Sequence, residues 1–138
     1  MKRQPFNYYL IVFLLCAVTK AMADERLEPC PDSPNCVSSL ATSAEHRIAP
    51  MSYGGDRAMA RLRLLAVLSQ LENTEIVEDT ELYLRVTVTS AVFRFVDDVT
   101  FFFDDEKALI QMRSASRSGY YDFGANRRRL EEIRQLYE

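Results

Sequence analysis

The feature that most constrains this chain is an apolar segment at residues 95–103 (FVDDVTFFF), which carries the adjacent acids Asp97 and Asp98. Apolar residues alternate along it, a pattern typical of a strand with one buried face. Arginine-rich segments follow at residues 113–117 and 122–127. Because a buried carboxylate is costly unless it is paired, we expect these acids to meet the later arginines in the fold.

Three separated motifs resemble a known family. They are FVDDV at residues 95–99, RSASRSGYYDFGANRRR at residues 113–129 and, upstream, PCPDSPNCVSS at residues 29–39. Their sequence and order resemble the bacterial and plastid domain-of-unknown-function family numbered 1499, over nearly all of the chain after residue 28. The resemblance implies a small secreted or lipid-anchored domain and brings no established activity with it.

The N-terminus has the three parts of a secretory signal peptide. Lys2 and Arg3 form a basic start, residues 8–18 are apolar, and Ala-Met-Ala at residues 21–23 is a small-x-small cleavage site. We therefore predict that residues 1–23 are a signal peptide and that the protein is periplasmic or secreted. An uncleaved anchor is the alternative, although the apolar run is shorter than the roughly 20 residues that span a bilayer.

Cys16 raises a second alternative, a membrane-anchored lipoprotein in which this cysteine is acylated and becomes the first residue. A lipoprotein signal requires a small residue just before the cysteine, and Leu15 occupies that position. Contact with the membrane is therefore expected only through the signal peptide or, less favourably, through a lipid anchor at Cys16.

Removal of residues 1–23 would leave 115 residues (138 − 23), enough for one domain with a single core. This mature form would carry 14 basic and 20 acidic side chains, a net charge of −6 (14 − 20). An acidic domain is unsuited to nonspecific binding of nucleic acid, so we expect no nucleic-acid partner.

Residues 24–55 show no periodicity and are rich in Pro, Ser and Asn, which predicts an extended arm. In an oxidising compartment Cys30 and Cys36 are expected to close a disulfide loop within it, two free thiols being the alternative. A zinc site would need two further ligands, and His46 is the single histidine of the chain. We therefore expect neither a metal nor a cofactor.

Residues 56–138 are predicted to form an α+β domain. Residues 57–73 have apolar residues at helical spacing, which predicts a helix with Asp56 as its N-cap and Asn73 at a left-handed C-terminal position. A second helix is predicted near the C-terminus of the chain. Strand patterns lie between the helices, which predicts two layers: an antiparallel sheet of three to four strands with two helices on one face. The first helix is expected to bury Met59, Leu62, Leu64, Leu65, Ala66, Leu68 and Leu71.

The last two predicted strands, residues 93–103 and 108–112, can be placed in register from the sequence. A tip at residues 104–107 pairs Phe101 with Ile110, Asp97 with Ser114, and Asp98 with Arg113. Alternation also places Asp97 and Asp98 on opposite faces of the sheet, so they cannot act together on one substrate.

The structural interpretation of the acids and arginines is a polar network that joins the hairpin to the last helix. Asp97, Asp98, Ser114, Asp122 and Arg127 are assigned to it. Arginine suits such a network because its planar guanidinium binds two acceptors at once.

The functional interpretation is a site for an anion, with Arg113, Arg117, Asn126 and Arg128 as its ligands. A helix that begins near Asn126 would add backbone N–H donors. A carboxylate, a phosphate or a lipid headgroup could bind there.

No phosphate-binding loop, nucleophile elbow or histidine-containing dyad is present in the sequence. We therefore assign no catalytic residue and predict a non-enzymatic envelope domain that binds a ligand or partner or serves as a scaffold. Its partner would be an envelope protein or a small anionic molecule. A small enzyme that uses the Asp/Arg cluster is the alternative.

Overall fold

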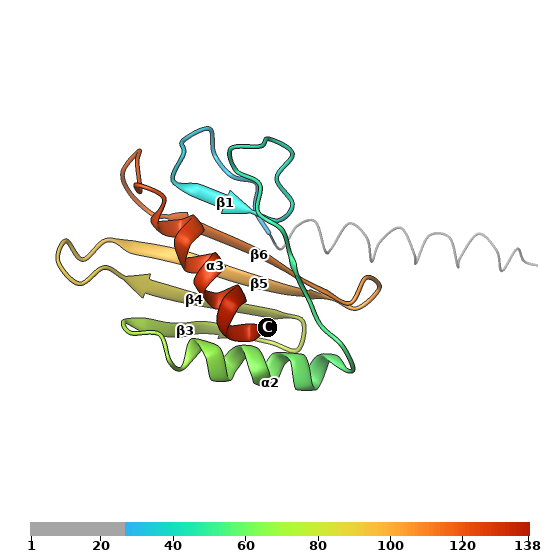
Figure 1. The fold of residues 1–138 in the computed structure, drawn as a ribbon. Coiled ribbons are helices and arrows are strands. Elements are labelled where there is room, and N and C mark those ends of the chain that lie inside the picture. The colour runs from blue at the N-terminus through green and yellow to red at the C-terminus, as the bar shows by residue number, and fades with distance from the viewer. Residues whose placement is uncertain (1–26) are drawn as a thin grey trace, which may run out of the picture.

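The computed structural model describes residues 27–138, in which an antiparallel sheet carries two helices (Figure 1). The predicted signal peptide, residues 1–23, and Cys16 lie outside the described residues. The elements are, in chain order, β1 (Cys36–Ser38), β2 (Met51–Ser52), α2 (Arg57–Leu68), β3 (Thr74–Asp79), β4 (Tyr83–Thr89), β5 (Val96–Asp104), β6 (Leu109–Ser116) and α3 (Ala125–Tyr137).

Within the described residues the sheet has six strands, more than the three or four predicted. Its order is β1-β6-β5-β4-β3, and β2 also pairs with β6. The two extra strands come from the segment predicted to be an extended arm. They have three and two residues, too short for alternation to reveal them in the sequence.

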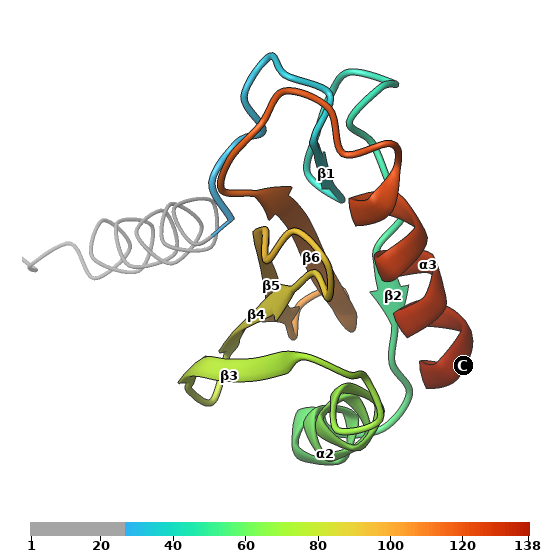
Figure 2. The ribbon, with the colours of Figure 1, turned by 90° about the vertical axis from the view of Figure 1, so that its left-hand side faces the viewer.

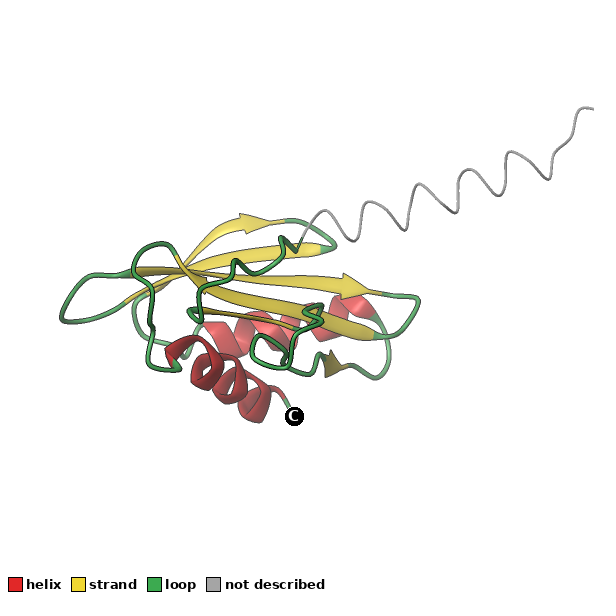
Figure 3. Ribbon diagram, turned by 90° about the horizontal axis from the view of Figure 1, so that it is seen from above, coloured by secondary structure: helices red, strands yellow, loops and turns green. Residues whose placement is uncertain are grey.

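Both helices lie on one face of the sheet (Figures 2 and 3), as predicted for an α+β fold. The core between the layers is built from alternate residues of β4, β5 and β6, such as Val86, Phe101 and Met112, which are fully buried. The opposite face of the sheet, called the open face below, carries no helix. This division places two different sets of polar side chains on the two faces.

The helix α2 begins as predicted and buries part of the predicted stripe: Leu64 and Leu68 are buried, and Leu65 is half-buried against the core. Asp56 is its N-cap and accepts from the backbone N–H of Met59 at 2.8 Å. Met59 and Leu62 are exposed, whereas Ala60 and Leu64 are buried. Apolar residues cover much of this helix, so the period alone does not select a face. The small Ala60 permits close packing on the side that is buried.

The predicted register of β5 with β6 was wrong by two residues. Phe101 lies opposite Met112 and Asp98 opposite Ala115, because the loop includes Ala108. Ala108 has φ 52°, and its carbonyl accepts from the Tyr53 backbone N–H at 3.0 Å. A shift of two leaves each side chain on its predicted face.

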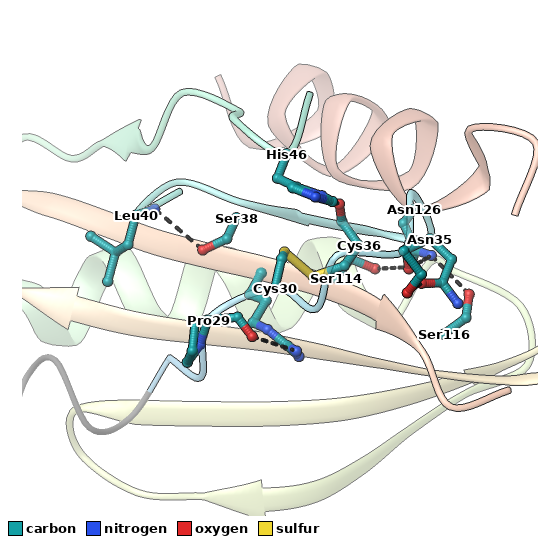
Figure 4. Close-up of a disulfide and its surroundings, with 12 residues drawn as sticks. Pro29, Cys30, Asn35, Cys36, Ser38, Leu40, His46, Ser114, Ser116 and Asn126 are labelled. Carbon is teal, nitrogen blue, oxygen red and sulfur yellow. Dashed lines mark hydrogen bonds between the residues drawn. A yellow bond between two sulfur atoms is a disulfide. The ribbon is translucent and has the colours of Figure 1, made fainter. Parts of the chain in front are cut away.

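The Cys30–Cys36 disulfide is present and joins the start of β1 to the segment that precedes it (Figure 4). Its sulfur atoms are 2.04 Å apart. The ring of His46 donates through Nδ1 to the Cys36 carbonyl at 2.9 Å. Two separate contacts therefore fix this cysteine, which pairs with Ala115 of β6.

Candidate functional site

A polar network lies between the sheet and α3. Asp97 of β5 accepts from Arg129 Nη2 at 2.6 Å. Arg129 Nη1 also donates to Ser114 Oγ (3.0 Å) and to Asn126 Oδ1 (2.9 Å), and Ser114 Oγ donates to the same Asn126 oxygen at 2.6 Å. These four residues, the helix-side network, join β5 and β6 to α3.

Asn126 of the helix-side network is fully buried and lies beside Asn35, Ser114 and Ser116 (Figure 4). Its Nδ2 donates to the Asn35 carbonyl (3.0 Å), to Ser116 Oγ (2.9 Å) and to Asp122 Oδ2 (2.8 Å). Asp122 also accepts from the backbone N–H groups of Gly124 and Asn126 at the start of α3. Because its polar groups are paired, the network serves the fold rather than a ligand.

The sequence identified only part of this network. Asp97, Ser114 and Asp122 take part as predicted, but Asp98 points to the open face. Arg127 donates instead to the carbonyls of Arg47 and Glu45, both at 2.8 Å. Arg129, the actual partner of Asp97, was missed.

The acid stability of the protein should depend on Asp122. Burial raises the pKa of this carboxyl, but hydrogen bonds from Asn126 and Gly124 outweigh burial and lower the pKa below its ordinary value of 3.8. A lowered pKa in the folded state stabilises the fold above the unfolded pKa, and this contribution is lost as the pH falls through the folded pKa. Asp122→Asn should therefore flatten the loss of stability below about pH 4, measured by urea unfolding across pH. A slope unchanged from the parent protein would contradict this assignment.

On the open face, Asp98 pairs with Arg117 rather than with Arg113 as predicted. Arg117 donates to both oxygens of Asp98, at 2.7 and 2.9 Å. The Arg117 hydrogen bond lowers the pKa of Asp98 below its ordinary value, against the effect of partial burial. The two-residue shift in register explains the exchange, because it moves Arg113 from Asp98 to Thr100.

A row of polar residues crosses four strands of the open face. Glu78 of β3 lies opposite Arg85 of β4, Arg85 opposite Thr100 of β5, and Thr100 opposite Arg113 of β6. A β-bulge in β3 between Ile76 and Glu78 brings Glu78 into this row. These four residues therefore lie side by side in one line across the strands.

The row forms the floor of a cavity of about 300 Å³, called the open-face pocket. Glu28, in the segment before Cys30, forms one wall of this pocket, and side chains of strands β3 to β6 form its other sides. The lining residues are Glu28, Glu78, Tyr83, Arg85, Asp98, Thr100 and Arg113.

Three buried polar atoms in this pocket have no hydrogen-bond partner among residues 27–138: Arg85 Nε, Thr100 Oγ1 and Arg113 Nε. Arg113 is only 9% exposed, and within residues 27–138 its side chain makes one long hydrogen bond, from Nη2 to the Pro29 carbonyl at 3.5 Å. Burial lowers the pKa of Arg113 below its ordinary value, although Glu28 and Asp98 oppose the shift.

No carboxylate lies within salt-bridge distance of Arg113 among residues 27–138, whereas Arg85 has Glu78 at 3.7 Å. A buried guanidinium without an acid is costly, because transfer from water is not offset by a counter-charge. Among residues 27–138, Arg113 is therefore the arginine of this pocket that has no carboxylate within salt-bridge distance.

The four residues predicted to bind an anion do not come together. Arg113 lines the open-face pocket, and Arg117 lies near it but is bound to Asp98. Asn126 lies across the sheet in the helix-side network, and Arg128 donates to the Phe123 carbonyl at 2.6 Å. Anion binding stays a prediction, now centred on Arg113.

Arg85 and Thr100 line the pocket but were not predicted from the sequence. Both alternate with core residues in their strands, which was a usable signal, since residues of one parity share a face. Their convergence with Arg113 depends on the register of three strands, and one of those registers was mispredicted. Glu28 could not be predicted as a pocket residue, because it lies in a segment with no hydrophobic periodicity.

Within residues 27–138, no group of three or more His, Cys, Asp or Glu side chains is placed to hold a metal ion. The same residues contain no helix of the length and hydropathy needed to cross a bilayer.

Comparison with known proteins identifies a family and nothing more specific. Searches of the curated proteins and of the solved structures each give no significant match. The model of the family described as "Protein of unknown function (DUF1499)" matches residues 26–136, which include the helix-side network and the open-face pocket. The chain therefore belongs to the DUF1499 family.

Proposed function

We propose that this protein is an exported, non-enzymatic binding domain that holds a small carboxylate in the open-face pocket. The observation that carries the proposal is Arg113, a buried guanidinium with no acidic partner among the described residues. Its planar fork can bind both oxygens of one carboxylate. Thr100 Oγ1 and Arg85 Nε would supply further hydrogen bonds.

The acids of the pocket narrow the class of ligand. Glu28, Glu78 and Asp98 also line it, so a dianion such as phosphate would meet repulsion from several sides. A monocarboxylate that also carries an amino or hydroxyl group can donate to these acids while Arg113 holds its carboxylate. The volume, about 300 Å³, lies at the lower end for ligand pockets and fits a molecule of this size. We therefore favour a small amino acid or hydroxy acid.

Binding is favoured over catalysis because the pocket has no activated nucleophile. In the row of residues that forms the pocket floor, Thr100 carries the hydroxyl group. This hydroxyl has no hydrogen bond to a base within residues 27–138. Nucleophilic catalysis requires such a base within hydrogen-bond reach.

The proposal is tested by titrating the protein with a panel of small amino and hydroxy acids, with phosphate and chloride as reference anions, by calorimetry and thermal unfolding. We expect saturable binding by a member of the first group. Arg113→Met should abolish it, and Arg127→Met, on the other face and outside the pocket, should leave it unchanged. Binding that survives Arg113→Met, or no saturable binding by any member of the panel, would overturn the proposal.

Export is tested separately by cell fractionation and intact mass. A periplasmic or secreted species that begins near Asp24, two mass units below the reduced form, would support export and the disulfide. A species that retains residues 1–23 in the soluble fraction of the cytoplasm would contradict it. An added acyl mass at Cys16 would instead identify the lipoprotein form.

A further inference from the structure

The exposed aromatic side chains gather in two loops. All five exposed aromatic residues of the described chain lie at residues 90–95, between β4 and β5, or at residues 117–124, between β6 and α3. The other six aromatic side chains of residues 27–138 are buried. Exposed aromatic clusters of this kind mark interaction surfaces. With Val92 they are named the aromatic end: Val92, Phe93, Phe95, Tyr120, Tyr121 and Phe123.

The topology brings both loops to the same end of the sheet. Thr89 at the end of β4 lies opposite Val96 at the start of β5, and Asp97 lies opposite Ser116 at the end of β6. The backbone N–H of Arg117 donates to the Val96 carbonyl at 3.0 Å, which ties the two loops at their bases. Figure 1 shows both loops extending past the strands at the end away from the β5–β6 turn.

The first loop holds its aromatic rings in place. The Ser90 N–H donates to the Phe95 carbonyl (2.8 Å), and the Phe95 N–H donates to Ser90 Oγ (2.9 Å), which closes the loop. Phe93 and Phe95 stack on each other with centroids 5.8 Å apart, yet Phe93 remains 74% exposed. The rings are therefore ordered without being buried.

The second loop holds Phe123 outward at a cost in backbone conformation. Phe123 has φ 53°, in the left-handed region that aromatic residues disfavour, and its side chain is 88% exposed. The Asp122 carboxylate, bonded to the Gly124 N–H, and Arg128, bonded to the Phe123 carbonyl, maintain this geometry. Strain of this kind in an ordered loop points to a role for the side chain that it presents.

The charge of the aromatic end differs from that of the domain. Residues 27–138 carry 13 basic and 18 acidic side chains, a net charge of −5 (13 − 18). The loops contain Arg94, whose side chain has no hydrogen-bond or acidic partner among residues 27–138, and Arg117, which is paired with Asp98. Asp122 is their one acid and accepts hydrogen bonds at the start of α3. The aromatic end is therefore less acidic than the rest of the domain and presents Arg94 as an unpaired cation, so an anionic surface is repelled least at this end.

We propose that the aromatic end docks on the anionic leaflet of a lipid bilayer. Phe and Tyr side chains would sit at the headgroup level, where aromatic rings are favoured, and Arg94 would contact lipid phosphates. The two loops project as separate ordered protrusions, a shape that a fluid headgroup layer accommodates without a matching recess. The assignment is independent of the open-face pocket.

The test uses the absence of tryptophan from the natural chain. Phe93→Trp and Phe123→Trp each give the full-length protein one tryptophan at the aromatic end. Leu62→Trp, on the exposed face of α2, is the matched control. Each variant is mixed with vesicles of phosphatidylcholine alone or with phosphatidylglycerol, and its emission and its quenching by brominated lipid are measured.

We expect emission to move to shorter wavelength and quenching to appear at positions 93 and 123 with anionic vesicles, and neither at position 62. Arg94→Gln should weaken the partition of Phe123→Trp about fivefold, the contribution of one arginine near an anionic surface. Unchanged emission at positions 93 and 123, or equal changes at all three positions, would overturn the proposal. A shift produced by a protein partner but not by vesicles would overturn it as well.

Discussion

Arg129→Met is expected to lower the free energy of unfolding by about 3–5 kcal/mol, because it leaves the Asp97 carboxylate without its partner. The two side chains are 16% and 11% exposed, so water cannot replace the lost ion pair fully. Ser114 and Asn126 would lose a donor at the same time. Urea unfolding of the oxidised protein measures the loss.

Arg127→Met is the matched control for this prediction. Arg127 precedes Arg129 by two residues in α3 but donates to two backbone carbonyls and to no acid. Its loss should cost about 1–2 kcal/mol. Adding Asp97→Asn to Arg129→Met should recover part of the stability, because it removes the unpaired charge. Equal costs for the two arginines would show that Asp97 is not held by Arg129.

Arg113→Met is expected to have the opposite sign and to raise the free energy of unfolding by about 1–4 kcal/mol in ligand-free buffer. Methionine fills a similar volume with apolar atoms and removes a buried guanidinium that has no carboxylate within salt-bridge distance among residues 27–138. A residue that destabilises the fold and is nevertheless present fits a functional requirement. The measurement is the same urea titration.

A bound ligand should offset most or all of this difference in stability. With a bound carboxylate at a hundred times its dissociation constant, the natural chain should gain about 2.7 kcal/mol and Arg113→Met nothing. A loss of stability in ligand-free Arg113→Met would mean that the guanidinium already has a strong partner within the chain. The open-face pocket would then lose its reason to bind an anion.

The sequence predicted the long elements of this fold and failed on the short ones. Period-two alternation over β4 and β5, and the apolar spacing of α3, identify elements long enough to repeat their pattern. β1 and β2 do not repeat a pattern at all, and pairing with β6 creates them. In α2 the type of element was right and the buried stripe right only in part, since Leu64 and Leu68 are buried but Met59 and Leu62 are exposed. Neighbouring helices and strands select one stripe among several apolar ones.

For the site, the sequence could identify residue types but not their partners. Asp97 was expected to pair with an arginine, and it does. Its partner is Arg129 because the rotation of α3 directs this side chain toward Asp97, which the sequence alone did not show. Arg113 was expected to pair with Asp98, but the loop lies one position later than predicted, at residues 105–108, with Ala108 in a left-handed conformation, and this changed the register. Such a local backbone choice decides which side chains meet across a sheet.

The pairing of β1 with β6 has a consequence for the order in which the chain can fold. Cys36 lies opposite Ala115, 79 positions later in the sequence, whereas β3 to β6 pair with neighbours in sequence. Contacts between distant positions are slow to form, and synthesis delivers the N-terminal end first. The emerging chain must therefore present residues 36–38 to its surroundings until β6 has been made. In an oxidising compartment the disulfide can close before β1 pairs with β6, because its two cysteines are only six positions apart.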